Sequence, residues 1–294
     1  MSWRRPKIGV VRFPGSNRDA DALRAVELCG GEAVPIWHES EDLLGVTGVL
    51  IPGGFSYGDY LRAGAMAAHS PVMRAVRRHA EAGGPVLGIC NGFQILLEAG
   101  LLPGAMLPNR SLRFIHKEVY LRVERDDTPL LAKLRRGQVV RLPIAHKEGN
   151  WFASEEELSA IEAKGLVALR YCSPHGEVDE AHNPNGALHG VAGLTNHEGN
   201  VLGMMPHPEC RVDPLVAEPF GKPFIAALVE AAGRPAAGWG WFLAAGLAVG
   251  LAIGSRMTLL VAALWLGVMV VWLNHARFSH QRGAFLARSA AFCL

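Results

Sequence analysis

The chain has 294 residues, of which 50% are hydrophobic and 19% are charged. These values exclude a disordered or collagen-like chain, and five cysteines are too sparse and odd in number for a small disulfide scaffold. A net charge of +2 provides no overall field for nucleic acid, so no nucleic-acid partner is expected.

The charge is unevenly distributed along the chain. Residues 236–294 contain four arginines and no Lys, Asp or Glu, whereas residues 1–235 hold 25 basic and 27 acidic groups. This change in composition near Pro235 predicts two parts, a globular domain over 1–235 and an apolar tail over 236–294. No signal peptide opens the sequence, so we expect a cytoplasmic domain with reduced thiols.

The first half of the domain alternates between strand and helix patterns. Strands are predicted at 8–13, 33–37, 48–51 and 85–89, and helices at 19–29, 72–82 and 92–98. Further extended segments are predicted at 119–123, 139–145, 166–171, 190–194 and 201–205. The pattern indicates an α/β fold, with a mostly parallel sheet, helices on both faces and antiparallel additions.

The segment Gly88-Ile-Cys-Asn-Gly92 lies between a buried strand and a helix, which is the context of a nucleophile elbow. Glycines two residues before and after Cys90 suit a sharp, strained turn in which side chains would clash. Such a turn lifts the sulfur above the sheet at a helix N-terminus, where the helix dipole favours the thiolate. We therefore predict that Cys90 is a nucleophile and that the N–H of Asn91 faces a developing oxyanion.

A cysteine nucleophile that cleaves an amide needs a base, and the base needs an orienting group. Two His-x-Glu pairs follow apolar strands, one beginning at His146 and the other at His207. The spacing alone does not choose between them. Gly53 and Gly54 follow a third strand and are candidates for the second half of an oxyanion hole, although an ordinary tight turn would look the same.

Four longer motifs extend this pattern. They are Phe13-Pro-Gly-Ser-Asn-Arg-Asp19, the stretch from Pro52 to Gly64, Gly88-Ile-Cys-Asn-Gly-Phe-Gln94 and Met204-Met-Pro-His-Pro-Glu209. In this order and spacing the chain resembles the PurQ-type glutaminase subunits of phosphoribosylformylglycinamidine synthase, which are class I triad glutamine amidotransferases. The resemblance implies that Cys90 is the nucleophile, His207 the base and Glu209 the acid that orients it.

The resemblance also implies a partner and a place in metabolism. Ammonia from glutamine would pass to a large synthetase subunit, in a complex that also holds a small accessory subunit, to make formylglycinamidine ribonucleotide. ATP and magnesium would belong to that partner, and no cofactor or metal is expected in this chain. Two alternatives stay open: a related cysteine amidase that acts on another amide, and a vestigial domain in a membrane-tethered scaffold.

The tail over residues 236–294 has an apolar pattern of its own. Residues 235–255 and 257–274 are two uncharged runs of 21 and 18 positions, separated by Arg256. Spanning helices need about 20 predominantly apolar residues, and glycines at 246, 250 and 254 suit close helix packing in lipid. We predict a transmembrane helical hairpin over about 238–255 and 257–274, with a basic C-terminal end, anchoring the domain to the cytoplasmic face of a membrane.

Overall fold

The computed structural model describes residues 5–234. The predicted hairpin over 238–255 and 257–274 therefore lies outside the described residues and stays a prediction. Within residues 5–234, no helix has both the length and the apolar character needed to cross a membrane.

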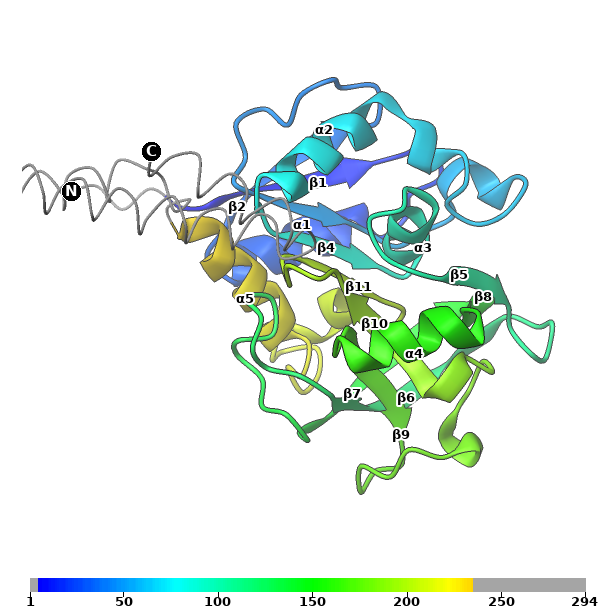
Figure 1. The fold of residues 1–294 in the computed structure, drawn as a ribbon. Helices are drawn as coiled ribbons and strands as arrows, with labels where there is room; N and C mark the ends of the chain where they lie inside the picture. The colour runs from blue at the N-terminus through cyan, green and yellow to red at the C-terminus, as the bar shows by residue number, and fades with distance from the viewer. Residues whose placement is uncertain (1–4, 235–294) are drawn as a thin grey trace, which may run out of the picture. The chain divides into compact units, whose positions relative to one another are not determined.

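A nine-stranded mixed sheet forms the centre of the domain (Figure 1). Its strands, in spatial order, are β2 (Glu32–Trp37), β1 (Lys7–Arg12), β3 (Gly48–Ile51), β4 (Val86–Ile89), β11 (Val201–Met204), β10 (Val191–Thr195), β9 (Val167–Cys172), β6 (Ile115–Val123) and β7 (Val139–His146). The first five strands pair in parallel, and the rest are joined in antiparallel fashion. The predicted parallel sheet with antiparallel additions is confirmed.

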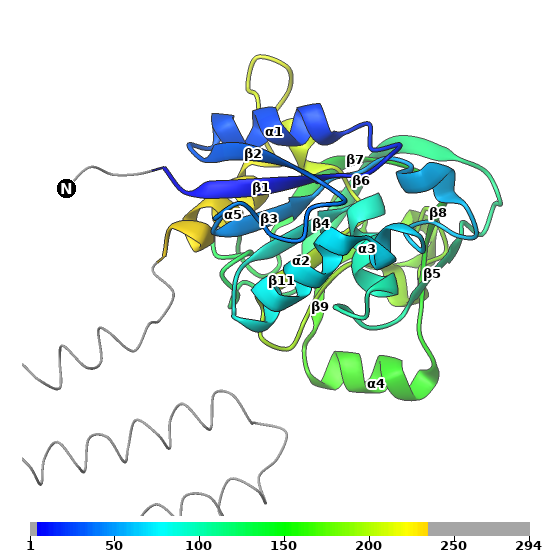
Figure 2. The ribbon, with the colours of Figure 1, turned by 90° about the horizontal axis from the view of Figure 1, so that it is seen from above.

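Helices cover both faces of the parallel half (Figure 2). The α-helices are α1 (Asp19–Leu28), α2 (Pro71–Glu81), α3 (Asn91–Glu98), α4 (Glu155–Ala163) and α5 (Lys222–Gly233). Helices α1 and α5 pack together on one face, while α2 and α3 lie on the other (Figure 2). Every residue of β3, β4 and β11 is buried, as expected of parallel strands enclosed between two helical layers.

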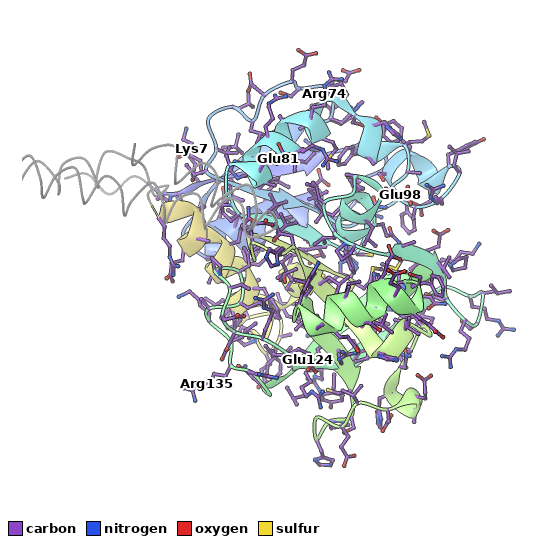
Figure 3. All side chains as sticks on the ribbon, in the orientation of Figure 1. Lys7, Arg74, Glu81, Glu98, Glu124 and Arg135 are labelled. Atoms are coloured by element: carbon purple, nitrogen blue, oxygen red, sulfur yellow. The ribbon has the colours of Figure 1, made fainter. Side chains whose placement is uncertain are left out.

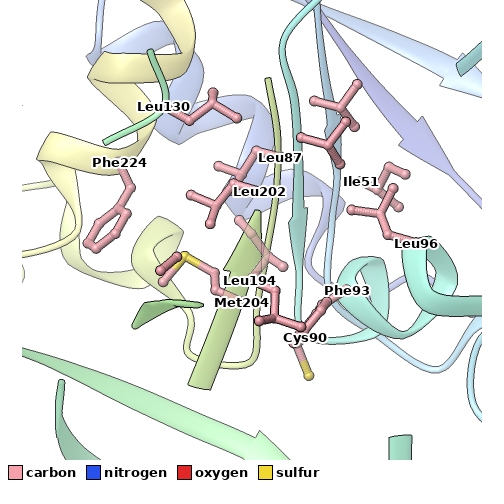
Figure 4. Close-up of a cluster of buried hydrophobic side chains, with 14 of the residues drawn as sticks. Ile51, Leu87, Cys90, Phe93, Leu96, Leu130, Leu194, Leu202, Met204 and Phe224 are labelled. Atoms are coloured by element: carbon pink, nitrogen blue, oxygen red, sulfur yellow. The ribbon is translucent and has the colours of Figure 1, made fainter. Parts of the chain in front are cut away.

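The hydrophobic core lies between these layers and reaches the carboxyl end of β4 (Figure 4). Ile51, Leu87 and Leu202 come from three adjacent strands and are fully buried. Cys90 lies at the edge of the same cluster, with its sulfur directed away from the apolar side chains (Figure 4). Charged side chains such as Lys7, Arg74 and Arg135 project outward instead (Figure 3).

Several elements were not predicted from the sequence. They are α4, α5, the two-stranded sheet of β5 (Ala105–Pro108) and β8 (Glu148–Phe152), and the 3₁₀ turns η1 (Ser56–Asp59), η2 (Ala67–His69), η3 (Glu180–His182), η4 (Leu188–Gly190) and η5 (Pro208–Arg211). Helix α4 does carry a local signal, because Ser154 and Glu157 form a capping box at its start.

Candidate active site

Cys90 occupies a strained turn between β4 and α3. Its backbone has φ +50° and ψ −105°, a left-handed conformation that side chains rarely adopt. Backbone hydrogen bonds hold the turn in place. The N–H of Cys90 donates to the carbonyl of Met204 in β11 at 2.7 Å, and the carbonyl of Cys90 accepts from the N–H groups of Phe93 and Gln94. The predicted strand–turn–helix around Cys90 is therefore present, with the sulfur at the N-terminus of α3.

Glycine at position 92 is required by the packing of this turn. A Cβ atom there would collide with the carbonyl oxygen of Ile51, at the end of the neighbouring strand β3. Helix α3 can therefore start directly above the sheet only if its second residue has no side chain. The first N–H groups of a helix have no partner within the helix, and Asn91 is the first residue of α3.

His207 and Glu209 form a buried ion pair just after β11. His207 Nδ1 lies 2.6 Å from Glu209 Oε1, and the two side chains are 4% and 0% exposed. The 3₁₀ turn η5 begins at Pro208 and turns the chain back, so that residues two apart in sequence face each other. This pairing fixes the imidazole with Nδ1 toward the carboxylate and leaves Nε2 as the atom available for proton transfer.

The electrostatics of the pair favour the protonated imidazole. Burial opposes the charge on His207, but the Glu209 carboxylate and the Cys90 sulfur outweigh burial and raise the pKa of His207 well above its usual range. Glu209 Oε2 and His207 Nε2 are both buried without a hydrogen-bond partner among residues 5–234. The structure therefore brings Cys90, His207 and Glu209 together, whereas the second candidate base, His146, has no such carboxylate partner among the described residues.

Gly53 lies between the thiol and the imidazole. A Cβ built on Gly53 would lie 2.8 Å from His207 Cε1 and 3.5 Å from Cys90 Cβ. The loop is fixed from outside, because Arg18 N donates to the Gly53 carbonyl at 3.3 Å and Phe55 N donates to the Gly15 carbonyl at 3.0 Å. The backbone of Gly53 is therefore held close to His207 and Cys90, in a position that suits the predicted oxyanion role, whereas Gly54 packs against Ser16 and Asn17.

Replacing Gly53 with alanine is expected to lower the turnover number for glutamine by about 100- to 1000-fold, as the loss of an oxyanion donor does. The added methyl group pushes the loop away from His207, and the N–H groups move with it. Glutamate release under saturating glutamine measures the effect. Gly83→Ala is the control for backbone strain alone, because Gly83 has φ +87° and open space around its Cα, so alanine strains the loop after α2 without contacting His207 or Cys90. A Gly53→Ala protein within twofold of wild type would exclude this role.

The edge strand β7 runs alongside the catalytic pair. The Pro143 carbonyl accepts from His207 N at 2.9 Å, and the Ala145 carbonyl lies 3.7 Å from Cys90 Sγ. His146 follows at the strand end and is only 3% exposed. The end of β7 that carries His146 is thus close to Cys90 and His207. Among the described residues, the imidazole of His146 contacts Asn109 and not a carboxylate.

A polar network behind the nucleophile was not predicted from the sequence. Gln94 Nε2 donates to the Glu148 carbonyl at 2.6 Å, and Asn91 Nδ2 donates to Gln94 Oε1 at 2.9 Å. Asn91 Oδ1 in turn accepts from Ser56 N at 3.2 Å. The network ties the nucleophile turn to the loop after Gly54 and to β8. Its only signal in the sequence is the position of Asn91 and Gln94 within the nucleophile motif.

Asp59 is a partly buried carboxyl group near this network. Burial, followed by the charge of Glu148, raises the pKa of Asp59 from 3.8 to about 6. Its Oδ1 is buried without a hydrogen-bond partner among the described residues, and its backbone has φ +54°. Asparagine tolerates this conformation and has the same shape.

Asp59→Asn is therefore expected to stabilise the fold at neutral pH. A carboxyl group whose folded pKa exceeds its unfolded pKa costs stability once pH rises through both values, and costs little below them. Relative to wild type, the variant should gain little at pH 4 and about 1 kcal/mol at pH 7.5, after allowance for solvent screening. Urea unfolding at both pH values measures the gain. Exposed Glu39→Gln is the control; a pH-independent gain would contradict the assignment.

A cavity of about 490 Å³ borders His207. Its wall includes Arg18, Lys117, Glu118, Arg211 and Cys210, and Arg211 forms an ion pair with Glu118. Ligand atoms of His207, Glu209 and Cys210 lie within 4.8 Å of one another, a spacing that could hold a metal ion. However, His207 Nδ1 and Glu209 Oε1 already contact each other at 2.6 Å, which leaves no room for an ion between these two atoms. The acid–base pair is the better interpretation.

The mixed α/β sheet, the strained cysteine above it and the adjoining imidazole–carboxylate pair define a glutamine amidotransferase of class I. A family model described as a CobB/CobQ-like glutamine amidotransferase domain matches residues 5–222. Phosphoribosylformylglycinamidine synthase subunit PurQ of Thermus thermophilus is 56% identical over 234 residues, which are 80% of this chain and 100% of the relative. The protein of the same name from Bradyrhizobium diazoefficiens is 53% identical over 226 residues, 76% of this chain and 97% of the relative.

A solved structure indicates the same family. One chain in the structure of PurLQS from Thermotoga maritima matches with a TM-score of 0.68 and 39% sequence identity, covering 77% of this chain and 99% of that chain. The chain belongs to the PurQ family, the glutaminase subunits of phosphoribosylformylglycinamidine synthase in purine biosynthesis.

Proposed function

We propose that Cys90, His207 and Glu209 form the catalytic triad that releases ammonia from glutamine. The observation that carries this proposal is the buried 2.6 Å contact between His207 and Glu209, next to Cys90 on its strained turn. His207 takes the thiol proton, and the thiolate attacks the carboxamide carbon of glutamine. The tetrahedral intermediate expels ammonia as His207 returns the proton to the leaving nitrogen, which leaves a glutamyl thioester on Cys90.

The second half of the reaction uses the same groups. His207 removes a proton from water, the hydroxide attacks the thioester, and glutamate leaves as the thiol is re-formed. In both halves the negative oxygen lies toward the N–H of Asn91 and the loop of Gly53 and Gly54. Glu209 keeps its charge throughout and stabilises the imidazolium, as the carboxylate of a triad does.

The ammonia is proposed to be consumed by a larger synthetase subunit in a complex that also holds a small subunit. The similarity to a chain of the Thermotoga maritima PurLQS structure supports this assembly. The ATP-dependent step, with its magnesium, is assigned to the synthetase.

A glutamine analogue with an electrophilic side-chain ketone tests the triad directly. The reagent should modify Cys90 and spare the other described thiols. Burial raises the pKa of Cys29 and Cys172 to about 11 and contributes to the still higher pKa of Cys210, so these thiols stay protonated. Peptide mass spectrometry locates the label, and excess glutamine should protect Cys90. Labelling spread evenly over Cys90 and the other three described cysteines would contradict the proposal.

A further inference from the structure

His146 is a buried titratable side chain that the proposed reaction does not use. It ends β7, directly after Ala145, whose carbonyl lies 3.7 Å from Cys90 Sγ. Its ring is also near enough to His207 for the charge of that residue to act on it. The imidazole of His146 packs against Gly149, where an added Cβ would lie 2.7 Å from Nε2, and its backbone adjoins the Ala145 carbonyl beside the nucleophile.

Asn109 determines which nitrogen of His146 carries the proton. The Asn109 side-chain NH₂ donates to the backbone carbonyls of Arg113 and His146, both at 2.9 Å. Its Oδ1 is thereby directed at His146 Nδ1, 3.0 Å away. Because an amide oxygen only accepts hydrogen bonds, Nδ1 must carry the hydrogen. Nε2 is then an unprotonated acceptor.

This acceptor has no donor. His146 Nε2 is buried without a hydrogen-bond partner among residues 5–234. Burial, and then the charge of His207, lowers the pKa of His146 to about 3. The ring therefore accepts a hydrogen bond at working pH but does not take the proton, so it cannot replace His207 as the base. A buried acceptor without a donor is costly to keep, and a bound ligand can remove that cost.

We propose that His146 Nε2 accepts an N–H of the substrate carboxamide, so that His146 selects glutamine as an amide. This inference rests on the proposed function. With the carbonyl oxygen of glutamine on the oxyanion donors, its NH₂ group lies on the His207 side of Cys90. Both N–H groups of the carboxamide need acceptors there. The carbonyl of Ala145 and the Nε2 of the next residue are the acceptors that the end of β7 provides.

Two matched variants distinguish the roles of Nδ1 and Nε2 of His146. In His146→Asn the side-chain amide reaches the position of Nδ1 and can keep the bond to Asn109, but nothing replaces Nε2. In His146→Gln the longer side chain carries its amide to the position of Nε2. Each full-length protein is assayed with its synthetase partners on two substrates, glutamine and the γ-methyl ester of glutamate. Both substrates yield glutamate, and only glutamine has carboxamide N–H groups.

His146→Asn is expected to lower kcat/KM for glutamine by about 10- to 100-fold, the effect of leaving one buried polar group unpaired, and to leave the ester within threefold. His146→Gln should recover at least part of the loss. An equal loss on both substrates in a protein with an unchanged melting temperature would assign His146 to structure alone. An unchanged rate on glutamine would also overturn the proposal.

A second measurement does not depend on how the His146 variants fold. In Cys90→Ala protein with ¹⁵N-labelled histidine, the Nε2 resonance of His146 should move when glutamine binds and stay in place when the ester binds. A resonance unmoved by saturating glutamine would exclude the contact. The outcomes are separable from the triad assignment. Glutamine hydrolysis by Cys90→Ala would defeat that assignment, whereas an active wild type with an insensitive His146→Asn defeats only this inference.

Discussion

Cys90→Ala is expected to abolish glutamine-dependent synthesis by the reconstituted complex, with a loss on the order of 10⁶-fold, the scale seen when a nucleophile that acts with its base is removed. No thioester can form without the sulfur. Synthesis from added ammonium salts should continue at the wild-type rate, because it uses only the partner's chemistry. Formation of the amidine product from each nitrogen source measures both quantities in one preparation.

Cys210→Ala is the matched control for this experiment. Cys210 is adjacent in sequence to Glu209, and its Sγ lies 4.0 Å from the Glu209 carboxylate. It is thus a thiol in the same site that lacks the strained turn and the helix N-terminus. The control should retain at least half of the wild-type activity with glutamine. Should Cys90→Ala keep glutamine-dependent turnover, or Cys210→Ala lose it, the nucleophile has been misassigned.

His207→Ala should have an effect of similar size on glutamine hydrolysis, again on the order of 10⁶-fold, because base and nucleophile act as a unit. Glu209→Gln should cost about 10⁴-fold, since it keeps the shape of the side chain but removes the charge that stabilises the imidazolium. Single-turnover formation of the thioester, followed by mass spectrometry, measures both losses without interference from the partner.

His146→Ala provides the comparison for the choice of base. Its loss should not exceed about 100-fold, because His146 holds no carboxylate partner and offers at most one hydrogen bond to substrate. Equal losses at positions 146 and 207 would mean that the two histidines cannot be assigned different roles.

Local sequence was sufficient for the parts of this site that lie on one continuous segment. The turn at Cys90 could be predicted because Gly88 and Gly92 lie two residues away on either side. Glycine is needed at both positions because side chains there would clash within the turn. The same holds for the strands and helices of the first half, whose ends differ from the predicted ones by at most one residue. Such elements are encoded in short-range periodicity and turn chemistry.

The contacts that complete the site come from pairings distant in sequence. Nothing near His146 or His207 shows which of them faces Cys90, because that depends on β11 pairing with β4 and on β7 lying along the carboxyl side of the turn. From the residues alone the choice stayed open, and the resemblance to a family was needed to favour His207. The tautomer of His146 depends on Asn109, 37 residues away, and no periodic pattern encodes such a contact.

The burial of Cys90 affects how the enzyme loses activity under oxidative conditions. Cys90 is only 5% exposed as a residue, and it lies between the Gly53 loop and the carbonyl of Ala145. Thiol–disulfide exchange requires a bulky disulfide to approach the sulfur in line, and its rate depends on access. Glutathione disulfide is therefore shut out of the site, while hydrogen peroxide, little larger than water, can enter. Inactivation in a stressed cell should proceed through sulfenic acid at Cys90, and a bound glutamine that fills the slot should also shield the sulfur from peroxide.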